Sequence, residues 1–490
     1  MHRLPENYIG VEYPNEMLSI IKSGLKSKTK PKKILIAGAG ISGLVAASLL
    51  KQAGHQVAVI EGNSRIGGRI YTVREPFTNG NYLDLGAMRI PNTHVLAFEY
   101  IRRFRLRTNI FNHSTQKDLI FVNNIHVSVE AYEKNPDILG FPVREWEKGK
   151  TAAELFLIAV QPFMDLYENS SLSEQIFLSK QFGKYSMETF LKKNPLGPSL
   201  SSTAINMINV MLGIEGFKEL AFISILSVTF PLFKHGIKFY EITGGNDNLP
   251  YAFTPELHSE ILLNEKIEKI TQTREGVLFQ TKNQITGEFH TYSGDYAILT
   301  IPFTAMQFVE ISPYSSISFK KRQAIHELQN IPAIKIGIEF KHRFWEANNQ
   351  GNAISDLPIR FSYIPSHDLG KSGPGVLLAS YCWGHDALLW NSLYDKEIIY
   401  YALKELAKVY GNVVYQEYMQ GFSFDWSRNP FSAGCLTLFS PTQQAAFGKT
   451  IQQTEGRLHF AGEHASSFPG WIEGAIESGI RAAHEVSGIQ

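Results

Sequence analysis

A glycine-rich turn near the N-terminus has the residue spacing that a dinucleotide pyrophosphate requires. Residues 38–43 read Gly-Ala-Gly-Ile-Ser-Gly. Gly38 permits a tight turn, Gly40 lets the backbone approach the pyrophosphate, and Gly43 lets a helix pack closely on a strand. The first N–H groups of the helix that follows have no intrahelical partner and can bind phosphate oxygens. This turn therefore predicts a dinucleotide site.

The stretches around the turn support that prediction. Apolar residues 34–37 precede it, a helix-like stretch follows to residue 52, and residues 56–60 form a second apolar run. Glu61 closes this run about 20 residues after the turn, where a carboxylate can bind both ribose hydroxyls. The glycine pattern alone is a weak signal. Together with a strand, a helix and an acidic residue it predicts a βαβ nucleotide-binding unit.

Length and composition narrow the class of protein. At 490 residues the chain exceeds what one hydrophobic core usually serves, so two or more domains are expected. The formal net charge of +1 provides no field for nucleic acid and favours a small-molecule substrate. The two cysteines, Cys382 and Cys435, exclude a disulfide framework and a cysteine-based cluster, and no metal site is expected.

No segment predicts secretion or membrane insertion. Residues 1–33 lack the apolar stretch of a secretory signal, and the most apolar run, residues 221–233, is too short to cross a bilayer and contains Pro231. We therefore expect a cytoplasmic protein without an integral membrane segment, and a buried helix or core segment at residues 221–233. The sequence is compatible with a homo-oligomer.

The remaining patterns predict a mixed α/β protein. Residues 131–235 have helical spacing, with a capping box at Thr151 and Glu154. Residues 270–300 alternate between turn signals, which predicts an antiparallel meander. Residues 334–340 predict a strand with isoleucines on one face and Lys335 on the less apolar one, where a lysine commonly reaches solvent. The last segment, from residue 458, predicts a strand, a loop and a helix.

Two segments resemble FAD enzymes of the amine oxidase superfamily, which have a glutathione-reductase-like fold. Residues 65–69, Arg-Ile-Gly-Gly-Arg, resemble an extension whose glycines bring backbone against the pyrophosphate and whose arginine supplies a charge. Residues 460–464, Phe-Ala-Gly-Glu-His, resemble the second flavin segment, in which the acidic residue contacts the ribityl chain. The resemblance implies FAD rather than NAD.

Two more segments narrow the resemblance. Residues 85–91, Leu-Gly-Ala-Met-Arg-Ile-Pro, and residues 470–473, Gly-Trp-Ile-Glu, resemble flavin-dependent L-amino-acid oxidases, and the likeness extends over nearly the whole chain. It implies oxidative deamination of L-amino acids to 2-oxo acids, with release of ammonia and hydrogen peroxide, by hydride transfer from Cα to flavin N5. The expected partners are an L-amino acid, large and apolar or aromatic, and molecular oxygen.

The resemblance also implies roles for site residues. Arg89 would bind the substrate carboxylate bidentately, and Tyr363 would add a hydroxyl donor. Lys335 would hold a water near flavin N5 and promote reoxidation by oxygen. Trp471 would form one wall of the substrate cage, with the Gly470 carbonyl directed at the substrate amine. The residues expected at the cofactor are Gly38, Gly40, Ile41, Ser42, Gly43, Glu61, Gly62, Arg65, Gly68, Arg69, Gly86, Ala87, Met88, Arg89, Ile267, Gly462, Glu463, Gly470, Trp471 and Ile472.

The same resemblance predicts three domains. A Rossmann-like FAD-binding domain would comprise residues 32–71, 244–322 and 447–490. A mixed-sheet substrate-binding domain would comprise residues 1–31, 72–130, 236–243 and 323–446. A helical domain would be inserted as residues 131–235.

Two positions depart from the family. Several members carry a histidine just before the segment at residues 239–242, where this chain has Phe230 as its nearest match and His235 out of register. Residues 432–435, Ser-Ala-Gly-Cys, resemble the place where monoamine oxidases carry a cysteine bonded to the flavin, but the apolar neighbours of Cys435 predict an unreactive thiol and dissociable FAD. A simple amine oxidase, a decarboxylating amino-acid monooxygenase and a non-catalytic flavin-fold protein remain alternatives.

Overall fold

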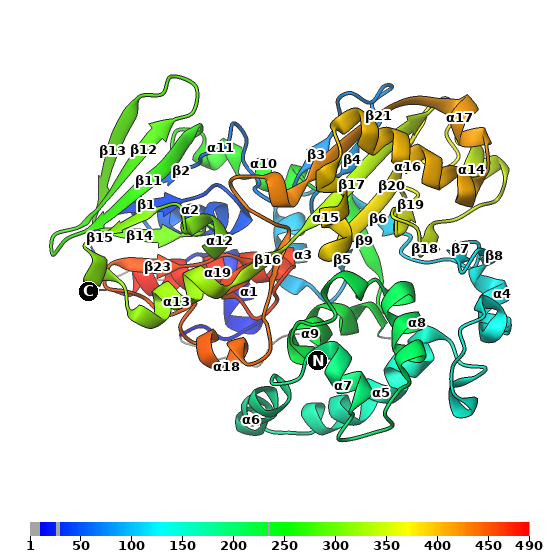
Figure 1. Cartoon of the computed structure of the whole chain (residues 1–490). Coiled ribbons are helices and arrows are strands. Elements are labelled where there is room, and N and C mark those ends of the chain that lie inside the picture. The colour runs from blue at the N-terminus through cyan, green and yellow to red at the C-terminus, as the bar shows by residue number, and fades with distance from the viewer. Residues whose placement is uncertain (1–9, 26–29, 234–235, 490) are drawn as a thin grey trace.

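The computed structural model describes residues 10–25, 30–233 and 236–489, so parts of the segment 1–33 and His235 lie outside the described residues. A five-stranded parallel sheet has the order β10-β2-β1-β14-β23. Figure 1 shows it in the left half of the molecule. Its strands are β1 (Lys33–Ala37), β2 (Gln56–Ile60), β10 (Ile261–Leu262), β14 (Tyr296–Leu299) and β23 (Leu458–Phe460).

Two helices pack tightly on this sheet, as the glycine pattern predicts. The helix α2 (Ile41–Gln52) follows β1, and α19 (Ile472–Ser487) follows β23. Their backbones approach closely, because a Cβ placed on Gly479 would lie 2.5 Å from the Ser42 carbonyl oxygen. The predicted βαβ unit and the final strand, loop and helix are therefore confirmed.

The predicted meander is correct only in part. Strands β11 (Glu265–Gln272), β12 (Val277–Asn283) and β13 (Phe289–Gly294) are antiparallel neighbours, and β15 (Glu310–Ser312) completes their sheet. The end of the stretch, β14, instead pairs in parallel with β1. Its residues 297–299 are fully buried, which is typical of a strand inside a parallel sheet.

A seven-stranded sheet occupies the other half of the molecule, in the order β21-β17-β20-β19-β18-β7-β8 (Figure 1). The predicted strand at residues 334–340 is confirmed as β17 (Ala333–Phe340). Its isoleucine face packs with α16 (Asp395–Tyr410) in one apolar cluster. The other face is also covered, and Lys335 is only 1% exposed, so it does not reach solvent as a lysine on a strand commonly does. The other strands are β21 (Tyr418–Asp425), β20 (Gly375–Trp383), β19 (Phe361–Tyr363), β18 (Ala353–Ser355), β7 (Leu119–Val122) and β8 (Ile125–Ser128).

The segment 131–235 is mainly helical where it is described, and Figure 1 shows these helices below the seven-stranded sheet. The capping box is present, since Thr151 N–H donates to Glu154 Oε2 at 2.7 Å and Glu154 N–H donates to Thr151 Oγ1 at 3.2 Å. The apolar run near residue 221 forms a helix, as predicted. The helices are α5 (Ala152–Glu168), α6 (Leu172–Phe182), α7 (Met187–Lys192), α8 (Ser202–Leu212) and α9 (Phe222–Phe233).

Short elements connect these parts. A three-stranded sheet has the order β5-β9-β6 and lies next to the site described below. Among the described helices, none has the length and apolar character needed to cross a bilayer. The elements concerned are α1 (Asn15–Ser23), β3 (Thr72–Val73), β4 (Leu83–Asp84), β5 (Ile90–Pro91), α3 (Val95–Arg103), β6 (Thr108–Phe111), β9 (Phe239–Ile242), α13 (Phe319–Glu327), β16 (Gln329–Ile331) and β22 (Leu436–Leu438).

Candidate active site

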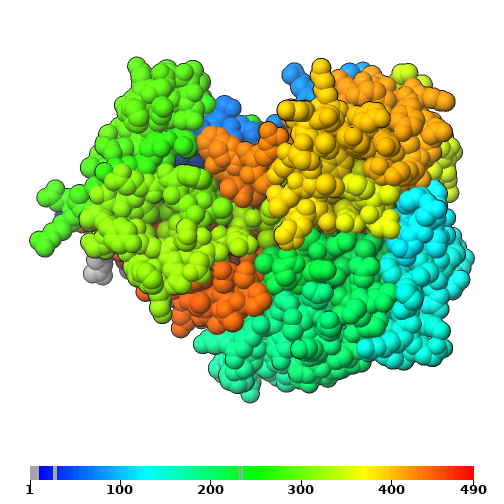
Figure 2. Space-filling view, in the orientation of Figure 1, coloured from blue at the N-terminus to red at the C-terminus, as the bar shows by residue number. Residues whose placement is uncertain are grey.

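A long cavity follows the carboxyl ends of β1 and β2 and encloses about 1500 Å³, open space at its mouth included. In the space-filling view a depression separates the two halves of the molecule, and N-terminal residues in blue reach the surface there (Figure 2). Most of the predicted site residues line the cavity: Gly38, Gly40, Ile41, Ser42, Glu61, Gly62, Arg65, Gly68, Arg69, Gly86, Ala87, Ile267, Gly462, Glu463, Gly470, Trp471 and Ile472. Five predicted residues do not: Gly43, Met88, Arg89, Lys335 and Tyr363.

The glycines build a bare backbone cradle. A Cβ on Gly43 would lie 2.1 Å from the Gly38 carbonyl oxygen, so Gly43 serves the packing of α2 on the turn. A Cβ on Gly40 would meet no atom within 4 Å, because this residue borders open space. Gly68 has a φ of +56° and its backbone approaches Gly40. This cradle fits a pyrophosphate, with the N-terminus of α2 beside it.

Glu61 lies at the end of β2 beside the turn. One carboxylate oxygen accepts the Ala39 N–H at 2.7 Å and the other accepts the Asn63 N–H at 2.8 Å. Burial raises the pKa of Glu61, while these backbone hydrogen bonds and Arg65 act to lower it. The carboxylate is thus fixed at the cavity wall where a ribose of the dinucleotide would lie.

The two segments that resemble flavin enzymes meet at the cavity although they are far apart in sequence. Arg69 Nη1 lies 2.7 Å from Glu463 Oε1, and the Gly470 N–H donates to Glu463 Oε2 at 2.7 Å. Thr437 Oγ1 adds a contact of 3.1 Å to the same carboxylate. Glu463 therefore connects the region before β3 to the loop that carries Gly470 and Trp471.

Four successive backbone carbonyls of residues 84–87 each accept a hydrogen bond from a side chain. Lys335 Nζ donates to Asp84 O at 3.0 Å and to Gly86 O at 2.7 Å. Trp426 Nε1 donates to Leu85 O at 2.8 Å. Asn246 Nδ2 donates to Ala87 O at 2.9 Å. This bracing fixes the chain that leads to Arg89, and sequence reasoning did not identify Trp426 or Asn246.

Lys335 lies in a nearly dry environment. Its ammonium also contacts Met88 Sδ at 3.2 Å and lies 4.3 Å from the centre of the Tyr381 ring. Burial lowers the pKa of Lys335 to about 7, although nearby Asp84 acts to raise it. Burial likewise raises the pKa of Asp84 to about 7, against hydrogen bonds from Thr72 and Asn246.

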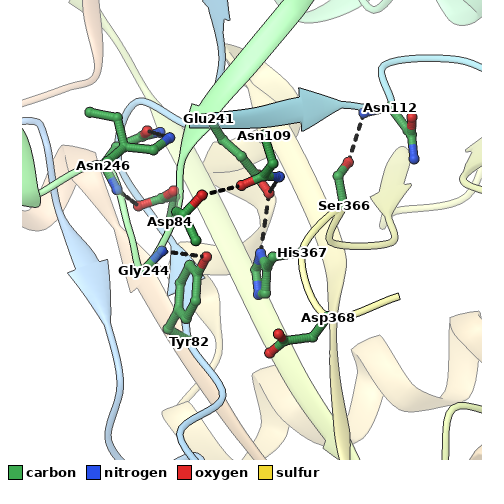
Figure 3. Close-up of polar contacts among 12 residues, drawn as sticks. Tyr82, Asp84, Asn109, Asn112, Glu241, Gly244, Asn246, Ser366, His367 and Asp368 are labelled. Carbon is green, nitrogen blue, oxygen red and sulfur yellow. Dashed lines mark hydrogen bonds and ion pairs between the residues drawn. The ribbon is translucent and has the colours of Figure 1, made fainter. Parts of the chain in front are cut away.

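A buried polar network lies beside Asp84 (Figure 3). Glu241 accepts a hydrogen bond from Asn109 Nδ2 at 2.7 Å and pairs with His367 Nδ1 at 3.3 Å. The Tyr82 ring stacks on His367 with 3.9 Å between ring centres. These contacts fix the chain just after β19, the strand that ends at Tyr363.

Arg89 has a neutral partner. Its Nη1 lies 2.9 Å from His113 Nδ1, and its guanidinium lies 5.7 Å from the centre of the Phe239 ring. Within the described ranges, no carboxylate forms an ion pair with Arg89. Burial and the adjacent Arg89 keep the pKa of His113 well below its usual value. His113 lies in a loop after β6, and no sequence pattern indicated it.

Aromatic side chains surround Arg89. Tyr363 is 7% exposed, and its ring lies parallel to that of His113 with 6.5 Å between centres. Tyr363 and Phe239 belong to one apolar cluster, and Tyr381 and Trp471 pack against it while also lining the cavity. Arg89 and Tyr363 therefore lie in an aromatic region next to the cavity rather than on its wall.

The structure also describes the two positions at which the sequence departs from the family pattern, the missing histidine and Cys435. Phe230 is buried in α9, and His235 lies outside the described residues. Cys435 lines the cavity, and burial raises the pKa of its thiol to about 12 although Arg69 acts to lower it.

A bare glycine cradle beside the Glu61 carboxylate, together with an aromatic region around the half-buried Arg89, is typical of a cofactor-dependent oxidoreductase of two-lobed α/β architecture. The chain belongs to the flavin-containing amine oxidoreductase family, whose model matches residues 41–487. Membership implies a flavin cofactor and confirms the family that the sequence motifs indicated.

Individual relatives agree with this assignment. YobN of Bacillus subtilis (strain 168), which is only provisionally named an L-amino-acid oxidase, is 45% identical over 475 residues, covering 96% of this chain and 98% of its own. The L-amino-acid oxidase of Siganus canaliculatus is 35% identical over 476 residues, covering 96% of this chain and 88% of its own. Cyclohexylamine oxidase from Brevibacterium oxydans IH-35A has a TM-score of 0.74 at 19% identity, covering 94% of this chain and 99% of that one, which is a likeness of fold.

Proposed function

We propose that the protein is an FAD-dependent L-amino-acid oxidase, which converts an L-amino acid and oxygen to a 2-oxo acid, ammonia and hydrogen peroxide. The observation that carries the proposal is the Arg89 guanidinium, which is half-buried, hydrogen-bonded to an imidazole and without an acidic partner in the described part of the chain. A guanidinium removed from water is costly unless an anion pairs with it. A substrate carboxylate supplies that anion, whereas a simple amine does not.

The substrate would be held by the chain's own side chains. Arg89 would bind the carboxylate in a two-point contact, and the Tyr363 hydroxyl would add a third donor. Fixing the carboxylate orients the Cα–H bond toward the place where it reacts. Holding a substrate in this way makes the reaction step effectively unimolecular, which increases its rate. The Gly470 carbonyl would accept a hydrogen bond from the substrate amine. Because that amine must be neutral to react, activity should rise with pH as the substrate ammonium loses its proton.

The cavity fits FAD, which we propose binds without a covalent bond. The glycine cradle would hold the pyrophosphate, Glu61 the ribose and Glu463 the ribityl side of the cofactor. When bound, the flavin supplies the redox chemistry, accepting two electrons from the substrate and passing them to oxygen. The high thiol pKa of Cys435 supports dissociable FAD, because it keeps the sulfur protonated at neutral pH. A protonated thiol is a much weaker nucleophile than a thiolate.

The preferred substrates would be large apolar or aromatic L-amino acids. This follows from the aromatic cluster around Tyr363 and Phe239, with Tyr381 and Trp471 at its border with the cavity. Trp471 would form one wall of the substrate cage. Lys335 would assist reoxidation by oxygen from behind the segment 84–88.

We further propose the three-domain division and a cytoplasmic location. The strands of the parallel sheet come from the three segments assigned to FAD binding, residues 32–71, 244–322 and 447–490, which supports that assignment. Both cysteines are free, which fits a reducing compartment.

A peroxide assay across L-amino acids, D-amino acids and simple amines tests the function. We expect peroxide, ammonia and 2-oxo acid in equal amounts from aromatic or large aliphatic L-amino acids. An amide and carbon dioxide in place of the oxo acid would show a monooxygenase. Comparable turnover of an amine would show an amine oxidase, and a flavin that no substrate bleaches under nitrogen would show a binding protein.

A further inference from the structure

The loop after β6 places an imidazole directly on the guanidinium of Arg89. His113 Nδ1 lies 2.9 Å from Arg89 Nη1, and the two residues are 24 positions apart in sequence. We propose that His113 is a positioning residue that holds Arg89 as a neutral hydrogen-bond acceptor and thereby makes the site selective for carboxylate-bearing substrates. This inference rests on the proposed function and concerns the same site.

The geometry determines the protonation state of His113. A guanidinium has only donors, so the nitrogen that faces it must accept with its lone pair. Nδ1 is then unprotonated and the imidazole proton is on Nε2. A histidine in this form orients Arg89 and adds no charge. An aspartate or glutamate at the same place would neutralise Arg89 and compete with a substrate carboxylate.

The loop that carries His113 is anchored. Asn352 Nδ2 donates to Asn112 O at 3.2 Å and to His113 O at 3.4 Å. The Asn112 N–H donates to Ser366 Oγ at 2.7 Å (Figure 3). Ser366 lies in the same chain segment as His367, which pairs with Glu241. The backbone of the loop at residues 112–113 is therefore held by two other segments.

The aromatic neighbours complete the placement. The His113 ring lies 4.9 Å from the Phe239 ring and is nearly parallel to the Tyr363 ring, with 14° between their planes. The imidazole therefore packs against Phe239 and Tyr363, two side chains of the aromatic cluster that we propose contacts the substrate. With Nη1 committed to His113, the remaining donors of Arg89 are left for a carboxylate, and no acid of the described chain takes them.

Three substitutions of His113 test separately its hydrogen-bond acceptor, its ring shape and its lack of charge. His113→Asn provides a carbonyl oxygen near the position of Nδ1, His113→Phe retains a flat ring without an acceptor, and His113→Asp provides a charge. Ser114→Ala, at the exposed neighbouring residue, is the matched control. Flavin content and thermal midpoint verify that each holoenzyme is folded.

Two readouts are measured on each holoenzyme. The first is steady-state oxidation of L-phenylalanine and of phenethylamine, and the second is benzoate binding, followed by the change in the flavin spectrum. For His113→Phe we expect KM for L-phenylalanine and Kd for benzoate to rise about 10-fold, as for loss of one hydrogen bond to a charged group, with kcat changed less. His113→Asn should recover most of both values. His113→Asp should weaken benzoate binding more than His113→Phe does. It should not lower the rate at which phenethylamine is oxidised.

The outcomes distinguish this proposal from the proposed function. If wild type oxidises no amino acid but binds benzoate in a His113-dependent manner, the oxidase assignment fails and the carboxylate site stands. Unchanged KM and Kd in His113→Phe, or no recovery in His113→Asn, overturns the role of His113 even if the enzyme is an L-amino-acid oxidase. If wild type neither oxidises amino acids nor binds benzoate, both proposals are wrong.

Discussion

The ammonium nitrogen of Lys335 lies 2.7 Å from the carbonyl oxygen of Gly86, a residue that lines the cofactor cavity. Lys335 itself does not line that cavity. Its three donors are directed at Asp84 O, Gly86 O and Met88 Sδ, so the lysine supports the cavity wall from behind. Any effect of its charge on the cofactor is transmitted across this one layer of backbone.

Replacing Lys335 with methionine should therefore have two effects. At a pH below the Lys335 pKa of about 7, flavin reoxidation by oxygen should slow more than anaerobic reduction by substrate, because the positive charge that Lys335 carries there is lost. The protein should also lose stability by about 1–3 kcal/mol, because buried carbonyl acceptors lose their donor. Stopped-flow measurement of the two half-reactions and urea unfolding test both effects. A lower stability with unchanged reoxidation would leave Lys335 as a structural brace only.

Arg89→Ala should retain the yellow flavin and lose most turnover. Removing one partner of a close charged contact costs about 2–5 kcal/mol, so kcat/KM for an L-amino acid should fall about 30-fold or more. Arg89→Lys should recover little, because an ammonium cannot reproduce the two-point geometry of the guanidinium. Steady-state kinetics and the flavin content check this. Equal activity of wild type on an L-amino acid and on its decarboxylated amine would contradict it.

Asp84 should make the stability depend on pH. Burial raises its pKa to about 7, whereas an unfolded chain ionises aspartate near pH 4. Between these values the folded protein retains a proton that the unfolded chain has released, so stability falls as pH rises through this window. The variant Asp84→Asn keeps an oxygen to accept from Thr72 and Asn246. Relative to this variant, the thermal midpoint of wild type should drop from pH 5 to pH 8, and a constant difference would contradict the prediction.

Local spacing explains what the sequence could predict. The cradle at residues 38–43 and Glu61 belong to one short βαβ unit, so their positions follow from turn, helix and strand patterns. The sequence pattern groups the strand β14 (Tyr296–Leu299) with the antiparallel meander because it begins two residues after the end of β13, although it pairs in parallel with β1. The apolar run at residues 296–299 is a local signal of a buried strand, but it does not identify the sheet that the strand joins.

Long-range contacts explain what could not be predicted. Lys335 binds a carbonyl 249 residues away, and Trp426 binds one 341 residues away. Every residue has a backbone carbonyl, so a sequence motif cannot indicate which carbonyl accepts a given hydrogen bond. His113 was missed because it lies in a loop, and its meaning depends on Arg89 being next to it in space.

Replacing two glycines of the cradle with alanine should have different effects, one on stability and the other on flavin binding. In Gly43→Ala the new Cβ would lie 2.1 Å from the Gly38 carbonyl oxygen, so we expect a loss of about 3 kcal/mol or more in stability. In Gly40→Ala the Cβ would meet no protein atom within 4 Å, so we expect unchanged stability after flavin removal but a lower flavin content. Gly488→Ala, at the end of α19, is the control. Full flavin content in Gly40→Ala would show that the cofactor does not approach this residue.

Cys435 decides whether the flavin is bonded to the protein. The residue lines the cavity, so its thiol borders the space that we propose for the cofactor. Reaction would require a thiolate, however, and burial raises the thiol pKa to about 12, with Arg69 and Lys335 only partly opposing the shift. At neutral pH the thiol is therefore protonated and a weak nucleophile. After acid precipitation we expect free yellow flavin in the supernatant, and Cys435→Ala should behave in the same way. A yellow pellet in wild type that is colourless in Cys435→Ala would instead establish a covalent bond and require a lower thiol pKa when the cofactor is bound.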